Sequence, residues 1–373
     1  MSHSNPFRRV IGPAVTAALL PALALGGTAR AAGPPARSPA AGARVVAARL
    51  TGVSCKGNSF CMAAGSYPYK GVRLTEAWNG RSWRDVRNPL SGNLTGISCG
   101  GPAFCFATRV RSPQGQAIGS AEWNGRTWKA FNSGDLFGVT CGSPKLCMII
   151  QEGASPHTIA GWNGKHWLAG PDACSGAPPG TDCGFTALDC GSATFCLANG
   201  YACDTTDCGD GRSPFTLIWN GSTWTWPGTD PTAVQRFADL SCSWGDFCMF
   251  IPYNRHATIA TIWQSAGWQD ASPNLPAVCH GAPHCWLRGP LSCGAPQDCV
   301  VIPIASPVSL IWSNFAWKAV PLARIRGTVP NLAGLSCGSS TNCMAVGSYG
   351  KPARPAAEHW NGTRWQLTRP LTR

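Results

Sequence analysis

The sequence predicts an all-β fold: a seven-bladed β-propeller of four-stranded antiparallel blades, with one disulfide in each blade. Seven pairs of Cys with five residues between them are spread along the 373 residues, and each pair is followed by two Trp whose positions differ by five. The chain holds 44 Gly and 31 Pro, which is typical of a protein that turns often. Only 13% of the residues are charged, which excludes a coiled coil.

The length of the repeat indicates the architecture. Its first Cys recurs at intervals of 42 to 52 residues, and a four-stranded propeller blade takes about 40–50 residues. A right-handed β-helix is the alternative, although its coils are shorter than this interval. The propeller is expected over residues 44–373, with units starting near residues 50, 94, 136, 185, 237, 288 and 332. The repeat Cys are Cys55 and Cys61, Cys99 and Cys105, Cys141 and Cys147, Cys190 and Cys196, Cys242 and Cys248, Cys293 and Cys299, and Cys337 and Cys343.

Each unit is expected to contain four short strands. In the first unit these are residues 50–55, residues 61–65, a third strand that ends at Trp78 and a fourth that starts near Trp83. Asn79-Gly80 lies between the last two strands and is a strong hairpin signal, because both residues tolerate positive φ. The signal recurs as Asn124-Gly125, Asn163-Gly164, Asn220-Gly221 and Asn361-Gly362, and is replaced by Gln264-Ser265 and Ser313-Asn314 in the fifth and sixth units.

Disulfide bonding is the expected state of the repeat Cys. Each pair joins the end of the first strand to the start of the second, and opposed residues of antiparallel strands lie at a separation that a disulfide spans. A bridge that closes so short a loop is expected to contribute about 2 kcal/mol. Zinc sites use closer spacings and gather several Cys around one ion, which disfavours metal binding at these pairs.

Six Cys lie outside the repeat. Cys279 and Cys285 have the repeat spacing, but no Trp pair follows them before the next Cys, which indicates a stapled insertion and not an eighth blade. His280 and His284 between them leave a zinc site as an alternative. The suggested bridges, which spacing alone does not prove, are Cys174–Cys183, Cys203–Cys208 and Cys279–Cys285.

The repeated Trp and Glu residues are interpreted as structural. Indole rings are large and mostly buried, so the Trp pairs are expected to pack between adjacent blades, with sugar-stacking platforms as the alternative. Three of the four Glu, namely Glu76, Glu122 and Glu358, stand just before the first Trp of their units. A carboxylate that recurs with a repeat is structural before it is catalytic.

The N-terminal 31 residues have the organisation of an export signal. Arg8 and Arg9 precede an apolar run, and Ala29-Arg30-Ala31 is a small-residue cleavage site. A membrane anchor is the weaker alternative, since the run is short and interrupted by Pro. Residues 32–43, rich in Ala, Pro and Gly, are expected to form a flexible lead-in. We therefore expect a secreted, extracellular protein, without a membrane span in its mature form and most simply a monomer.

The unit motif Leu-x-x-Val-Ser-Cys, Cys-x-Ala-x-Gly and Trp-Asn-Gly-x-x-Trp resembles the tandem repeats of secreted actinobacterial proteins. The resemblance covers residues 50 to about 368. The Trp-Asn-Gly-x-x-Trp hairpin is also similar to the Asp-box of sialidase-type propellers, a turn between the third and fourth strands of a blade. These resemblances imply a propeller but no single function, because Asp-box propellers include hydrolases, receptors and assembly factors.

One face of the propeller is expected to bind a ligand. The second-to-third loops and the blade connections share this face and vary in length, as binding loops do. All five Tyr follow the second Cys of their units by five to eight residues, in the second-to-third position, with basic and polar neighbours. The alternative is that each Tyr only caps a strand end. The predicted ligand-binding residues are Tyr67, Tyr69, Arg73, Arg109, Arg111, Tyr201, Arg212, Tyr253, Arg255, His256, Tyr349 and Arg354.

The partner expected for this Tyr- and Arg-bearing rim is an extracellular glycan, a cell-wall polymer or a protein. The net charge of +13, or +10 without the signal, suits an anionic partner. Nucleic acid is not expected, because Lys is sparse and no basic run exists. No cofactor is expected either; Asp204, Asp207 and Asp210 at three-residue spacing only weakly match a calcium loop.

A non-catalytic binding or scaffold module is the favoured function, and an extracellular glycan hydrolase or lyase is the alternative. A glycosidase needs two carboxylates flanking the scissile bond, and Glu152 is the one Glu outside the repeat. The resemblance to sialidase-type propellers would also imply an arginine triad, a Tyr–Glu pair and an acid Asp. The enzyme alternative therefore rests on Glu152, Tyr253 and rim Asp residues.

Overall fold

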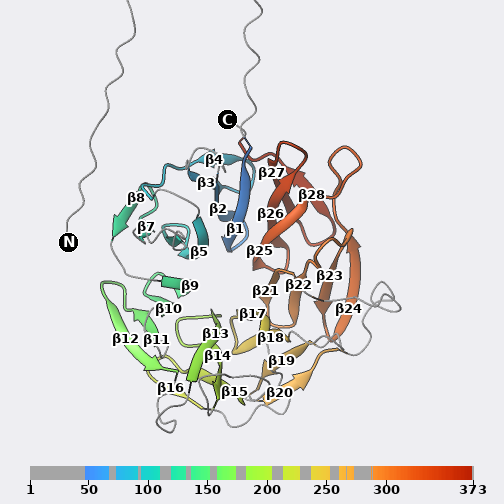
Figure 1. The fold of residues 1–373 in the computed structure, drawn as a ribbon. Coiled ribbons are helices and arrows are strands. Elements are labelled where there is room, and N and C mark those ends of the chain that lie inside the picture. The colour runs from blue at the N-terminus through green and yellow to red at the C-terminus, as the bar shows by residue number, and fades with distance from the viewer. Residues whose placement is uncertain are drawn as a thin grey trace, which may run out of the picture. The chain divides into compact units, whose positions relative to one another are not determined.

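A computed structural model shows the propeller that the repeat predicts (Figure 1). In the described residues the chain forms strands β1–β28, which pair into seven four-stranded sheets. The predicted fold class is therefore confirmed. The structure describes residues 47–66, 73–90, 94–109, 119–131, 136–151, 158–173, 182–203, 213–226, 237–252, 260–265, 267–272, 287 and 289–371.

Each blade consists of four consecutive strands, and blades 1 to 7 follow the chain. Blades 1 to 4 are β1 (Arg49–Lys56), β2 (Phe60–Ser66), β3 (Arg73–Trp78) and β4 (Trp83–Asp85); β5 (Leu94–Gly101), β6 (Phe104–Arg109), β7 (Ser120–Trp123) and β8 (Trp128–Phe131); β9 (Leu136–Ser143), β10 (Leu146–Gln151), β11 (Thr158–Trp162) and β12 (Trp167–Asp172); and β13 (Asp182–Cys190), β14 (Cys196–Cys203), β15 (Ser213–Trp219) and β16 (Trp224–Thr225). Blades 5 to 7 are β17 (Phe237–Ser243), β18 (Phe247–Pro252), β19 (Thr261–Gln264) and β20 (Gly267–Asp270); β21 (Leu291–Ala295), β22 (Asp298–Val301), β23 (Val308–Ser313) and β24 (Ala316–Pro321); and β25 (Asn331–Ser339), β26 (Asn342–Tyr349), β27 (Arg354–Trp360) and β28 (Trp365–Thr368).

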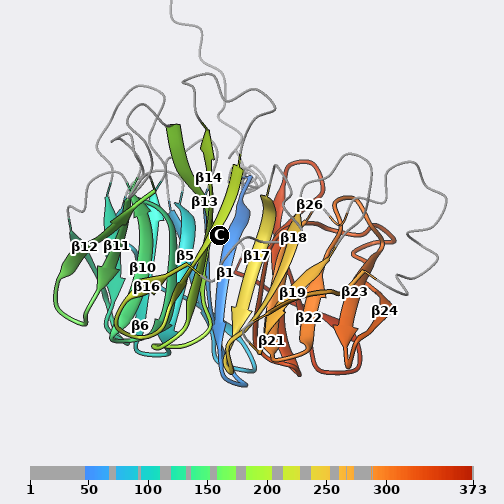
Figure 2. The ribbon, with the colours of Figure 1, turned by 90° about the horizontal axis from the view of Figure 1, so that it is seen from below.

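The strands run between two faces of the ring (Figure 2). Within each sheet they pair in chain order, so the first strand is innermost and the fourth outermost. The end of the third strand lies beside the turn between the first two: Trp123 Nε1 donates to Pro102 O at 3.1 Å, and Trp360 Nε1 donates to Ser340 O at 3.1 Å. We call the face with these turns the Cys-turn face and the opposite one the long-loop face.

All seven predicted blade disulfides are present. The two Cys of each bridge are opposed in the register of the first and second strands, as for Cys55 and Cys61, and their Cα atoms lie 3.9–4.0 Å apart. Cys183 and Cys203 each take part in a disulfide bond as well. Their suggested partners and the residues of the possible zinc site, Cys174, Cys208, Cys279, Cys285, His280 and His284, lie outside the described residues.

The Trp pairs pack between blades, as predicted. In six blades the two rings of a pair contact each other with centroids 5.3–5.8 Å apart. Each pair also joins the apolar core of the preceding blade: Trp78 and Trp83 cluster with Met344 and Val346 of blade 7. Aromatic side chains bury 150–250 Å² each, so these rings supply much of the surface that holds neighbouring blades together.

The Asn-Gly turns form, but for a different reason from the one predicted. Only the Gly has positive φ, from 89° to 96°. The Asn acts through its side chain: Asn79 Oδ1 accepts the backbone N–H groups of Arg81 at 3.0 Å and Ser82 at 2.9 Å. The hairpin is thus a four-residue turn closed by an Asn side chain, and not a two-residue turn with both residues in the left-handed region.

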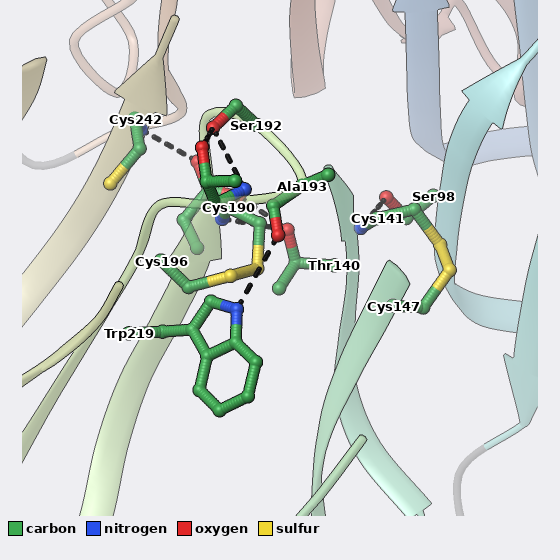
Figure 3. The surroundings of a disulfide bond; sticks show 12 residues. Ser98, Thr140, Cys141, Cys147, Cys190, Ser192, Ala193, Cys196, Trp219 and Cys242 are labelled. Atoms are coloured by element: carbon green, nitrogen blue, oxygen red, sulfur yellow. Dashed lines mark hydrogen bonds between the residues drawn. A yellow bond between two sulfur atoms is a disulfide. The ribbon is translucent and has the colours of Figure 1, made fainter. Parts of the chain in front are cut away.

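A circle of hydrogen bonds joins the inner strands. The side-chain oxygen of the residue before the first Cys accepts the backbone N–H of the first Cys in the next blade, as Ser98 does for Cys141 at 2.9 Å and Thr140 for Cys190 at 3.1 Å (Figure 3). The same bond occurs at every blade junction, with lengths of 2.7–3.1 Å. The acceptors are Ser54, Ser98, Thr140, Asp189, Ser241, Ser292 and Ser336.

The ring closes without exchanging a strand between its ends. Blades 1 and 7 each take all four strands from one continuous stretch of the chain. We call the junction of blades 7 and 1 the seam, because the chain does not run across it. Hydrogen bonds hold it from one face to the other: Ala48 N to Ala353 O (2.9 Å), Cys55 N to Ser336 Oγ (2.8 Å), Trp83 Nε1 to Thr368 Oγ1 (2.9 Å), Asn342 Nδ2 to Gly57 O (2.7 Å) and Leu371 N to Glu76 Oε2 (3.0 Å).

The predictions on targeting concern residues 1–31 and 32–43, which lie outside the described residues. Nothing helical in the described ranges is long or hydrophobic enough to span a bilayer. The seven blade disulfides are consistent with an oxidising compartment.

Candidate functional site

The structure places part of the predicted rim. Tyr201, Tyr349 and Arg354 are described with their side chains, while Arg73 is placed as the first residue of β3 and Arg109 as the last of β6. The remaining rim residues, the three Asp of the possible calcium loop and Glu152 of the enzyme alternative lie outside the described residues: Tyr67, Tyr69, Arg111, Arg212, Tyr253, Arg255, His256, Asp204, Asp207, Asp210 and Glu152.

A groove of about 640 Å³ opens on the long-loop face at the seam. Three separate segments line it: the β26–β27 loop (residues 349–354), the connection between blades 6 and 7 (residues 325–331) and Arg49 at the start of β1. Tyr349 and Arg354 of the predicted rim are both in the lining. The groove therefore brings two of the predicted rim residues together.

The β26–β27 hairpin presents the predicted pair. Tyr349 and Arg354 are directly opposed at the end of the two strands, so their side chains leave the sheet on the same face. Both are half-buried, whereas Lys351 and Pro352 at the loop tip are exposed. An aromatic ring and a guanidinium thus stand side by side at the groove wall.

A second hairpin presents Arg326. Ile325 and Thr328 exchange both backbone hydrogen bonds, at 2.8 and 3.1 Å. The two residues between them, Arg326 and Gly327, have φ of 52° and 83°, which is the two-residue turn that fits the strand twist. Arg324 Nη1 donates to Gly327 O at 3.0 Å and so holds the turn. Arg326 is left exposed at the tip.

The start of β1 completes the groove from the other side of the seam. Ala48 donates its N–H to Ala353 O at 2.9 Å, which fixes the first strand beside the blade 7 loop. The next residue, Arg49, is exposed and lines the groove.

The charged groups of the groove all carry the same sign. Arg49, Arg326, Lys351 and Arg354 line it, and no Asp or Glu does so among the described residues. Sequence reasoning missed Arg49 and Arg326 as site residues. The Arg-Gly pair at 326–327 was the one local signal, since it favours a tight turn on a blade connection.

Tyr201 lies apart from this groove. It is inside β14 of blade 4, two residues before the strand ends at Cys203, and not in a loop. Its ring is so close to Gly184 on β13 that a Cβ on that glycine would lie 3.0 Å from it. The half-buried Tyr201 therefore packs over a neighbouring strand.

The central channel is a second polar cavity, of about 250 Å³, lined by the inner strands. Lys56 and Asp189 bring charge into a lining otherwise made of hydroxyl and apolar groups. Burial lowers the pKa of Lys56, and the negative charge of Asp189 opposes that shift. Asp189 Oδ2 accepts the N–H of Cys242 at 2.7 Å, and its Oδ1 accepts from Thr140 Oγ1 at 2.5 Å. Its carboxylate thus serves blades 3 and 5 as a structural acceptor.

Asp239 is a related group in blade 5. Its Oδ1 accepts the N–H of Leu240 at 3.0 Å and its Oδ2 that of Leu291 in blade 6 at 2.9 Å. Burial raises its pKa to about 7, against the effect of these two backbone donors and with a contribution from the charge of Asp189. Both oxygens are committed to backbone donors, so this carboxyl also joins neighbouring blades.

The recurring Glu residues have a structural role at two blade junctions. Glu358 is fully buried, and its Oε2 accepts the N–H of Ala323 in the blade 6–7 connection at 2.8 Å. Glu76 is fully buried and accepts the N–H of Leu371 across the seam at 3.0 Å. Glu122 is half-buried in β7. Burial raises the pKa of Glu358 to about 7, and the Ala323 N–H partly opposes the shift.

No three His, Cys, Asp or Glu side chains gather as a metal ion would require in the part of the chain that the structure describes. The calcium prediction concerns residues outside it.

Comparison with known proteins supports the fold. No family model matches the sequence, and no curated protein matches it. Among solved structures, the chain is similar to the β-propeller domain of Cps50 (Swd1) from Myceliophteria thermophila, at 11% identity and a TM-score of 0.58, covering 84% of this chain and 97% of that one. It is also similar to the β-propeller domain of the Trilobed protease from Pyrococcus furiosus, described as having an open velcro topology, at 10% identity and a TM-score of 0.57, covering 86% and 97%.

A third similar structure is YCF48 bound to D1 peptide, at 12% identity and a TM-score of 0.50, covering 77% of this chain and 85% of that one. At such identities the likeness shows the propeller fold alone. The actinobacterial and Asp-box resemblances of the sequence remain predictions.

Proposed function

We propose that the protein is a secreted, non-catalytic binding or scaffold module that recognises an extracellular glycan, a cell-wall polymer or a protein through its long-loop face. The observation that carries the proposal is the groove at the seam. Its volume of about 640 Å³ is within the range of ligand sites, about 300–1,000 Å³. It combines an aromatic ring, basic groups and apolar side chains on a rigid scaffold, as binding sites do.

The contrast between the two faces supports this choice of site. Turns on the Cys-turn face are short and close on themselves: the side-chain oxygens of Asn79, Asn124 and Asn163 are each taken by two backbone donors of their own turns. On the long-loop face, segments from three parts of the chain converge on one groove.

The positions of the described Glu residues favour binding over catalysis. A general acid or base must reach the bond that reacts. Glu358 and Glu76 are instead fully buried and hold backbone N–H groups of a neighbouring blade. The similar YCF48 structure holds a D1 peptide, so a propeller of this kind can serve as a binding module.

Binding of the purified mature protein to isolated cell walls tests the proposal. Much less of the double variant Tyr349→Ala/Arg354→Ala than of the wild type should stay bound to the cell walls, because the variant lacks the ring and the guanidinium at the groove wall. Arg126→Ala is the matched control, since Arg126 is exposed in a turn of the Cys-turn face. Wild-type retention by the double variant would overturn the assignment of the groove, and products released from a glycan panel would overturn the non-catalytic role.

A further inference from the structure

The groove at the seam gathers positively charged side chains, and no acidic side chain among the described residues of its lining balances them. Its four basic side chains, Arg49, Arg326, Lys351 and Arg354, form no hydrogen bond or ion pair with a described residue. Like charges gathered in a cleft repel one another and raise the local concentration of anions. An anionic ligand would relieve this repulsion.

Arg326 occupies a position that favours a different residue type. With φ of 52°, it lies in the left-handed region that Gly and Asn enter more easily than a long side chain does. The guanidinium group of the neighbouring Arg324 donates a hydrogen bond to the carbonyl oxygen of Gly327, which stabilises this turn. Backbone strain that is held in place beside a cleft is a reason to look for a function of the strained residue.

The remaining lining suits a sugar chain better than a peptide. A peptide that adds a strand needs an unpaired sheet edge. β26 and β27, which form the groove wall, are paired on both sides. The groove offers the Tyr349 ring and Pro352 as apolar surfaces, and Thr328, Asn331 and Ser348 as hydrogen-bonding groups.

A nucleic acid is also a poor fit to this lining. Single strands bind to a series of aromatic side chains on which successive bases stack. Tyr349 is the one aromatic side chain among the groove residues.

We infer that the groove at the seam binds an anionic polysaccharide, with Arg326, Arg354, Arg49 and Lys351 contacting its acidic groups and Tyr349 packing against its sugar rings. This inference rests on the proposed function and names its ligand class. Arg forms paired hydrogen bonds with carboxylate, sulfate or phosphate oxygens, which makes three Arg in one groove selective for such groups over neutral sugars. The contacts come from both sides of the seam, so the polymer would lie across the junction of blades 7 and 1.

Matched polymers on immobilised surfaces test the inference with the full mature protein. Dextran sulfate and polygalacturonate should bind, with affinity that falls as salt is raised, and uncharged dextran should not. Inorganic sulfate alone should compete only weakly. Loss of one Arg contact should weaken binding about tenfold, because hydrogen bonds to charged groups are the strong ones.

Two variants probe the charged contacts and one is the control. Arg354→Ala removes a half-buried guanidinium, and Arg326→Asn removes a charge while keeping a residue that tolerates the left-handed turn. Both should lose affinity for the acidic polymers and keep the wild-type thermal midpoint. Arg126→Ala makes the same charge change on the Cys-turn face and should bind as the wild type does.

The outcomes separate this inference from the proposed function. Equal, salt-independent binding to dextran and dextran sulfate would overturn the anionic ligand and leave a glycan-binding module. Tighter binding to poly-glutamate than to the acidic glycans would assign the groove to an acidic protein segment instead. If Arg126→Ala lost as much affinity as the groove variants, the loss would come from net charge and the groove assignment would be wrong. If the wild type bound no polymer and no cell walls, the proposed function itself would be overturned.

Discussion

Glu358→Gln is the substitution for which the structure makes the most specific prediction. The Glu358 side chain is fully buried, and its Oε2 accepts the N–H of Ala323, which leads into the hairpin that carries Arg326. Gln keeps an oxygen acceptor of nearly the same shape but does not ionise. The exchange therefore tests the cost of charging this site and leaves the hydrogen bond in place.

Stability is expected to depend on pH through this group. Burial raises its pKa from 4.5 to about 7. The folded chain thus binds the proton more tightly than the unfolded chain, so the stabilising contribution is complete below about pH 4.5 and is lost as pH rises to about 7. A shift of this size corresponds to about 3 kcal/mol. The unfolding free energy of the wild type, minus that of Glu358→Gln, should fall by this amount between pH 4.5 and pH 7.5.

Urea unfolding with the disulfides kept oxidised measures this difference at several pH values. His359 and Asp239, whose pKa values are also shifted by burial, are present in both proteins, so their contributions cancel. A difference that stays constant from about pH 5 to pH 8 would refute the reasoning, because it would show that Glu358 ionises in the folded protein as easily as in the unfolded chain.

Three further substitutions test the contacts between and within blades, each by urea unfolding. Asp189→Ala leaves the Cys242 N–H without its acceptor and should lower the free energy of unfolding by about 1–3 kcal/mol. Asp189→Ser instead supplies the hydroxyl typical of this position and should recover most of this stability. Equal losses in the two variants would contradict the hydrogen-bond role of Asp189. Gly142→Ala places a Cβ 2.0 Å from Ser192 O and should sharply lower stability, while Gly267→Ala meets nothing within 4 Å and should not. A paired Cys→Ser exchange of the blade 2 disulfide should cost about 2 kcal/mol, and an unchanged midpoint would count against the loop-closure estimate.

The blades could be predicted because their signals are local. Two Cys with five residues between them can form a bridge only at a tight turn, and a Trp pair at fixed spacing marks the ends of two paired strands. The hydrogen bonds between the inner strands of neighbouring blades are different, because each joins residues more than 40 positions apart. Ser98 and Thr140 occupy the same place in their units, but nothing in either unit identifies the Cys N–H that each accepts.

The groove could be predicted only in part for the same reason. Tyr349 and Arg354 belong to one hairpin, so their closeness in the sequence was enough to predict that they lie near each other. Arg49 joins them because ring closure brings the first strand beside the last blade, about 300 residues away in the chain. The role of Asn79 was misassigned because a tight-turn signal does not tell whether the backbone or the side chain of Asn stabilises the turn.

The seam makes this propeller mechanically unequal around its circumference. Six junctions are crossed by the covalent chain, whereas a force that separates the two ends of the propeller acts first on the hydrogen bonds between blades 7 and 1. Arg49 and Arg354 stand on opposite sides of this junction. A polymer bound by both residues would link blades 7 and 1. At a free polymer concentration one hundred times the dissociation constant, it would add about 2.7 kcal/mol to the stability of the closed ring.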